Sequence, residues 1–74
     1  MDDAQLDDGR YDAFVVWAEA RDDDRIACDL TITTGAHKGV VLTVLARTTG
    51  DPLALVGLPC TLVVEGGNPR ITRF

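Results

Sequence analysis

The sequence predicts an all-β domain, a small barrel of five strands with one short helical turn between the third and fourth. Three observations lead to this prediction. Apolar and polar residues alternate over much of the chain with the two-residue period of β-strands. Glycine- and proline-containing segments separate these alternating runs. The chain of 74 residues is too short for two packed sheets, and the open edges of one small sheet invite aggregation, so closure into a barrel is expected.

The first two strands are expected on either side of an acidic turn. Residues 10–20, RYDAFVVWAEA, are rich in the aromatic and β-branched residues that favour strands. We expect Tyr11 and Trp17 to share one face of this strand and Phe14 to face the core. Residues 21–25, RDDDR, have the composition of a turn. Residues 26–33, IACDLTIT, alternate as a half-buried strand does, with Ile26, Cys28, Leu30 and Ile32 on the apolar face.

The next stretch predicts a hairpin. Residues 34–39, TGAHKG, link the second strand to the alternating run VVLTVLAR at residues 40–47. Gly35 and Gly39 would supply the positive φ angles that the reversal needs. A phosphate-binding Walker loop is excluded, because Lys38 precedes its glycine and a strand follows instead of a helix.

The helical turn and the last two strands follow. Thr49 or Asp51 can cap a turn that starts at Pro52 and covers residues 53–56, and Gly57 ends it. Residues 60–65, CTLVVE, alternate as a fourth strand. Residues 66–69, GGNP, form a turn by composition, and RITRF at residues 70–74 is the last strand.

Negative charge is concentrated near the start of the chain. Residues 1–25 hold nine acidic side chains against three arginines, whereas residues 26–74 hold three acidic and four basic side chains. The net charge of −5 therefore belongs to the first third of the sequence, and the rest is nearly neutral. We expect a flexible acidic segment at residues 1–9 and a single folded domain at residues 10–74.

Several functional classes are not expected. The opening Met-Asp-Asp-Ala has neither a basic start nor an apolar run, so we expect no signal peptide and a cytoplasmic bacterial protein. No apolar run approaches the roughly 20 residues of a membrane helix. Cys28 and Cys60 lie in alternating apolar segments and are expected as buried thiols without a metal, because no ligand lies at metal-binding spacing.

Catalysis is not expected either. The chain contains no serine, and its one histidine, His37, lies in a glycine-flanked turn that offers no fixed geometry for a general base. The three consecutive aspartates of RDDDR do not alternate as the ligands of a calcium loop do. We therefore expect a protein that is not an enzyme and has no cofactor.

Five strands with a helical piece between the third and fourth is the order of an OB-fold barrel, and an SH3-like or Sm-like barrel is the alternative. The segments GRYDAFVV, LTITTGAHKGVVL and DPLALVGLPCTLVV carry a further resemblance. In their pattern of glycines and alternating apolar residues they resemble small OB-fold proteins of phages and mobile elements that bind single-stranded nucleic acid or assist replication. The similarity covers roughly residues 9–74.

The resemblance implies a ligand lying across the second and third strands, between the first inter-strand loop and the last. Single-strand binding uses aromatic platforms and cations, although the outward positions of those two strands offer no aromatic side chain. The candidate nucleic-acid-binding residues are Trp17, Tyr11, Lys38, His37, Arg47, Arg70 and Arg73.

Two functions are therefore expected from different classes. The first is an accessory factor that binds single-stranded nucleic acid weakly or within a replication or recombination complex. The second is an acidic interaction module, a nucleic-acid mimic, that engages a basic protein through Asp22, Asp23 and Asp24. A homodimer would suit either function, because it would cover Val41 and Leu45 on an otherwise polar face.

Overall fold

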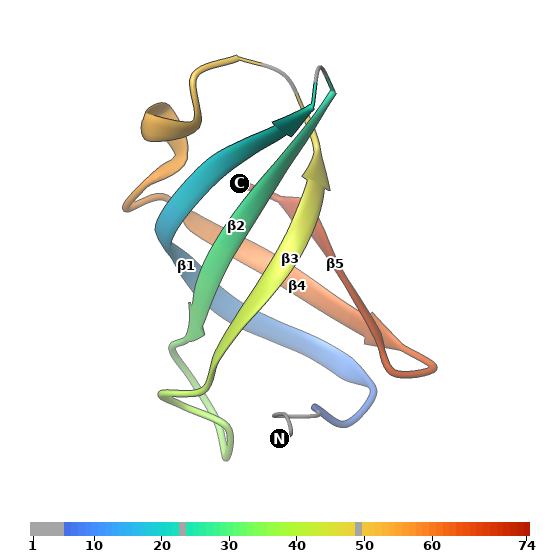
Figure 1. Cartoon of the computed structure of the whole chain (residues 1–74). Coiled ribbons are helices and arrows are strands. Elements are labelled where there is room, and N and C mark those ends of the chain that lie inside the picture. The colour runs from blue at the N-terminus through green and yellow to red at the C-terminus, as the bar shows by residue number, and fades with distance from the viewer. Residues whose placement is uncertain (1–5, 23, 49) are drawn as a thin grey trace.

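The computed structural model describes residues 6–22, 24–48 and 50–74. It shows an all-β chain in which five antiparallel strands curl into a half-barrel, with a single 3-10 turn between the third and fourth strands (Figure 1). The predicted all-β class and the order of the elements are thus confirmed. The elements are β1 (Gly9–Asp22), β2 (Arg25–Ile32), β3 (Val41–Arg47), η1 (Pro52–Leu55), β4 (Pro59–Glu65) and β5 (Asn68–Arg73).

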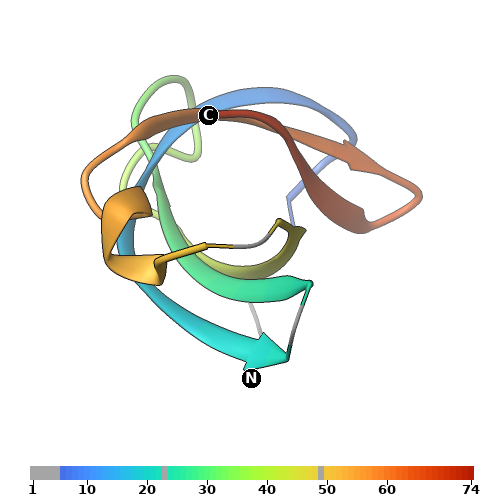
Figure 2. The same ribbon diagram turned by 90° about the horizontal axis from the view of Figure 1, so that it is seen from above.

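The long strand β1 is the centre of the sheet, whose order is β3-β2-β1-β4-β5. Its first half pairs with β4 and its second half pairs with β2. Seen from above, the strands curve around one interior, and η1 lies on the outside beside β1 (Figure 2). The edge strands β3 and β5 contact each other, but no ladder joins them in the described chain.

A β-bulge at Val16 changes which side chains of β1 face inward. Val15 lies opposite Leu30 and Trp17 lies opposite Asp29, so Val16 is the extra residue. At the same place the main chain of Val15 bonds to the segment after η1, donating to the Leu58 carbonyl at 3.0 Å and accepting from Gly57 at 2.7 Å. The bulge lies where the bonding partner of β1 changes from β4 to residues 57 and 58. Bulges bend a strand and increase its twist.

The core fills the inside of the half-barrel with aliphatic side chains and the two thiols. The largest of the almost completely buried side chains are those of Leu30, Ile32, Leu62, Val15 and Cys28. The alternation predicted for residues 26–33, 40–47 and 60–65 is confirmed, because the expected apolar faces point into this core. From β1 the core takes the small residues Ala13, Val15 and Ala18.

The connections follow the predicted turn chemistry. Gly35 and Gly39 have φ angles of 80° and 92°, and the Gly39 N–H donates to the Ile32 carbonyl at 2.8 Å to close the loop between β2 and β3. Asp51 caps η1 by accepting a 3.0 Å hydrogen bond from the Leu53 N–H, and Pro52 takes the first helical position. The alternative cap, Thr49, lies outside the described residues.

The chain just before β1 packs against the half-barrel. Leu6 is buried in the core cluster. The Asp8 carboxylate accepts hydrogen bonds from the N–H groups of Gly66 and Gly67, at 3.1 and 3.4 Å, in the turn between β4 and β5. Residues 6–8 thus join the start of β1 to a turn almost sixty positions further along the chain.

Candidate nucleic-acid interface

The outer face of β1, β2 and β3 carries Trp17 and Arg47 of the predicted nucleic-acid-binding residues. It consists of the side chains of these strands that point away from the core. Three rows of opposite residues cross it: Phe14–Thr31–Val41, Trp17–Asp29–Thr43 and Glu19–Ala27–Leu45. Val41 and Leu45 are 58% and 50% exposed, as predicted. The outer face therefore combines exposed apolar side chains at its ends with a polar pair near its middle.

Two aromatic side chains from β1 lie on this outer face. Trp17 is 47% exposed and Phe14 is 38% exposed, and both sit opposite residues of β2. The prediction that Phe14 faces the core is wrong, because the inward positions beside it belong to Ala13 and Val15. The expectation that Tyr11 and Trp17 share a face is also wrong. Tyr11 packs against the core cluster, and the bulge at Val16 turns Trp17 outward.

The charges of the outer face are mixed. The Asp29 carboxylate, opposite Trp17, accepts a 2.6 Å hydrogen bond from the hydroxyl of Thr43. Glu19 follows two positions after Trp17 and is exposed. Arg47 lies opposite Arg25 at the end of the face, where β3 ends. A bound phosphate would thus meet cations at this end and carboxylates near Trp17.

Tyr11 and His37 meet at a different part of the molecule. Their rings lie edge to face with centroids 5.8 Å apart. The Tyr11 hydroxyl donates to the main-chain carbonyl of Asp7, and the His37 Nε2 is 3.8 Å from an Asp7 carboxylate oxygen. Lys38, next to His37, is exposed in the loop between β2 and β3. Tyr11 and His37 thus hold the chain before β1 against this loop.

The acidic turn between β1 and β2 contains one ion pair. The Arg25 guanidinium donates to the Asp22 carboxylate at 2.6 Å, and this hydrogen bond lowers the pKa of Asp22 below its ordinary value. The same contact raises the pKa of Arg25. Asp24 is exposed, and Asp23 lies outside the described residues. Asp22 and Arg25 are thus paired within this turn.

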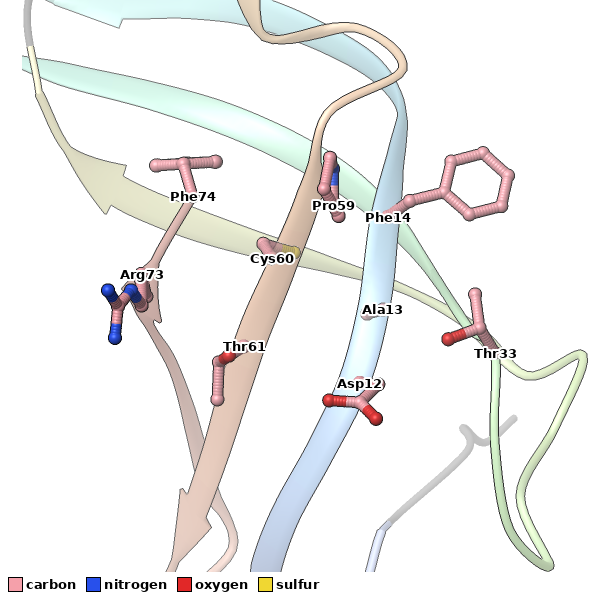
Figure 3. Close-up of a pocket in the computed structure, with 9 residues that line it drawn as sticks. All are labelled: Asp12, Ala13, Phe14, Thr33, Pro59, Cys60, Thr61, Arg73 and Phe74. Atoms are coloured by element: carbon pink, nitrogen blue, oxygen red, sulfur yellow. The ribbon is translucent and has the colours of Figure 1, made fainter.

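Arg73 lines an open hollow on the outside of β1 and β4. The hollow has a volume of about 440 Å³. In Figure 3 the ring of Phe14 extends away from β4, whereas Arg73 and Phe74 lie on the opposite side of β4. Arg70, the other predicted cation of β5, forms a 3.2 Å ion pair with Glu65. The described residues lining the hollow are Asp12, Ala13, Phe14, Thr33, Pro59, Cys60, Thr61, Arg73 and Phe74.

Cys28 and Cys60 are free, buried thiols, as predicted. Burial raises the pKa of both, and at Cys60 the neighbouring Cys28 adds to this effect. Within the described ranges, no three His, Cys, Asp or Glu side chains gather as a metal site. The described helical segment, η1, has four residues, far too few to cross a membrane.

The predicted nucleic-acid residues therefore separate into three groups. Trp17 and Arg47 share the outer face of β1–β3, and Arg70 and Arg73 lie on β5. Tyr11 and His37 lie beside the chain before β1, and Lys38 follows His37 in the loop between β2 and β3. The structure adds Phe14 to the outer face.

The chain has no counterpart in the comparisons with known proteins. No family model matches it, and no curated protein and no solved structure is significantly similar to it.

Proposed function

We propose that this chain is a non-enzymatic binding module of the OB-fold type. The support is its strand connectivity. β1 pairs with β2 on one side and β4 on the other, β4 continues into β5, and a helical turn links β3 to β4. The OB-fold is a five-stranded, partly open barrel whose ligands lie over strands two and three, and this connectivity supports assigning the chain to it. β3 and β5 are in contact, which agrees with a partly open barrel.

The ligand we propose is single-stranded nucleic acid, held on the outer face of β1–β3. The observation that carries this proposal is the pair of exposed aromatic side chains, Trp17 and Phe14, on that face. An aromatic ring offers a stacking platform to any base, and each stacked base contributes about 1–3 kcal/mol. Two such platforms on one strand would hold successive bases without reading their sequence.

The affinity of this site would come from stacking more than from charge. Phosphate contacts usually supply much of the affinity for nucleic acid. Here Asp29 and Glu19 lie near Trp17, and Arg47 and Lys38 lie toward opposite ends of β3. The module would therefore bind weakly alone and act as an accessory factor within a replication or recombination complex, where a partner adds affinity.

The test is the affinity of the full chain for a fluorescently labelled, short single-stranded DNA at low salt, followed by anisotropy. Trp17→Ala and Phe14→Ala should each weaken binding at least about fivefold, since each loses one stacked base. Leu53→Ala is the matched control. Leu53 is 62% exposed on η1, outside the proposed site. Equal affinities for all four proteins, or no binding by the wild type, would overturn the proposal.

The second candidate is the acidic interaction module. Asp24 is exposed beside the Asp22–Arg25 ion pair, at the tip of the hairpin formed by β1 and β2. A basic partner would meet carboxylates there. Asp24→Asn should weaken binding to a poly-lysine peptide if this turn is the interface. The same substitution should leave or increase the affinity for single-stranded DNA, and this difference separates the two candidates.

A further inference from the structure

The two edges of the sheet differ in how they are protected against pairing with another chain. An edge strand exposes main-chain donors and acceptors, and proteins block such edges with proline, charge or covering elements. β5 carries Pro69, which has no N–H to donate, and the charged side chains of Arg70 and Arg73. This edge is therefore poorly suited to further strand pairing.

β3 lacks proline and charge along most of its length. From Val41 to Ala46 its sequence, VLTVLA, contains no charge, no proline and no glycine. Uncharged segments of six residues with high β-propensity are those that pair readily with further strands. Figure 1 shows β5 converging on β3 toward the ends of the two strands and diverging toward their starts. The beginning of β3 is thus the part of this strand that lies farther from β5.

The outward side chains of β3 are also apolar. Val41 and Leu45 are 58% and 50% exposed, and Thr43 lies between them. Exposed aliphatic side chains on an uncharged edge lose apolar contact with water when a second strand covers them. The uncharged main-chain edge of β3 and its exposed aliphatic side chains therefore both favour pairing with a further strand.

We propose that β3 pairs in antiparallel fashion with β3 of a second copy of this chain, about a two-fold axis at Thr43. In this register Val41 of one copy lies opposite Leu45 of the other, and Leu45 of the first copy lies opposite Val41 of the second. Arg47 lies opposite Gly39 of the second copy, so no like charges meet along the seam. The pairing is self-complementary, and this is why a second copy is the occupant. It joins the two half-barrels into one continuous sheet.

The first test is the mass of the full chain in solution by light scattering, over a concentration series up to millimolar. The wild type should approach twice 8.0 kDa. The double variant Val41→Lys, Leu45→Lys should remain at the monomer mass, because charges on an edge strand block pairing. Val16→Lys is the matched control, since Val16 is 40% exposed but lies on the central strand β1. It should dimerise as the wild type does.

The second test fixes the register and does not depend on the lysine variant folding. Thr43→Cys should form a disulfide-linked dimer under mild oxidation, because the two introduced thiols lie on the axis. Thr61→Cys on β4 should not, and the native thiols are buried. A wild type that stays monomeric at millimolar concentration, a dimer that survives both lysines, or a Thr43→Cys variant that does not cross-link would each overturn the proposal. It does not depend on nucleic-acid binding.

Discussion

Trp17 of β1 lies directly opposite Asp29 of β2, whose carboxylate is held by a 2.6 Å hydrogen bond from the Thr43 hydroxyl. An aromatic platform thus has a fixed negative charge beside it. The pair combines an attraction for bases with a repulsion for phosphates.

Removing this charge should strengthen binding of single-stranded DNA. Two charges 4 Å apart in water interact by about 1 kcal/mol, so Asp29→Asn should raise the affinity about fivefold at low salt. Asp51→Asn is the control. It removes the same charge at the N-cap of η1, which is not part of the outer face, and asparagine caps a helix as well as aspartate does. An equal gain for both variants would mean that only net charge matters and that Asp29 has no local role.

Leu6 should contribute to the stability of the domain although it precedes the first strand. Its side chain is 8% exposed in the core cluster. Truncating a buried leucine costs about 2–5 kcal/mol, so Leu6→Ala should lower the free energy of unfolding in urea by an amount in this range. Leu53→Ala, at a position 62% exposed, should change it by less than about 0.5 kcal/mol. Similar unfolding curves for the two variants would show that Leu6 does not pack in the core.

The two thiols should make the protein less stable at alkaline pH. Burial raises the pKa of Cys28 and Cys60 above the ordinary 9.0, so the folded chain holds these protons more tightly than the unfolded chain. Their contribution to stability is complete below pH 9. It is lost as the pH rises through the pKa values of the two thiols in the folded chain. Urea unfolding from pH 7 to pH 10.5 should show this decline. Cys28→Ala, Cys60→Ala should flatten it, and a decline of unchanged slope in that variant would assign it to other groups.

The ion pair of the β1–β2 turn acts at the opposite end of the pH scale. The hydrogen bond from Arg25 lowers the pKa of Asp22 in the folded chain. The ion pair therefore stabilises the fold at pH values above the pKa of Asp22 in the unfolded chain. This contribution disappears as the pH falls through the pKa of Asp22 in the folded chain. Arg25→Ala should raise the titration midpoint of the Asp22 carboxyl, measured by NMR. Arg21→Ala removes a nearby arginine and should leave that midpoint in place. A midpoint that does not move in Arg25→Ala would contradict the pairing.

The sequence predicted most of the strands because their side chains alternate without interruption. β2, β3 and β4 each place one apolar residue in every two against the core. The cap at Asp51 and the glycines of the β2–β3 loop were also predictable, because each depends on the chemistry of a few neighbouring residues.

The part of the site on β1 could be predicted only in part. Both faces of this strand carry apolar residues, so the alternation of apolar and polar residues does not identify the face that points into the core. The decisive features are long-range. The buried side chains that β1 contributes to the interior, Ala13, Val15 and Ala18, are small, and the bulge at Val16 depends on main-chain bonds from Val15 to residues 57 and 58. The sequence predicts Trp17 as a candidate binding residue but predicts Phe14 in the core, whereas both side chains are exposed on the outer face. The packing of Leu6 has no periodic signal at all.

The central claim is that Trp17 contacts bound bases, and the fluorescence of this residue tests it most directly. Trp17 is the only tryptophan in the chain. Titration with a short single-stranded DNA at low salt should quench its emission, because a stacked base lies against the indole. Added salt should weaken the quenching only in part, because stacking contributes more to the affinity than phosphate contacts do. Unchanged emission at DNA concentrations that saturate a labelled-oligonucleotide assay would contradict the account, because binding would then occur away from the outer face.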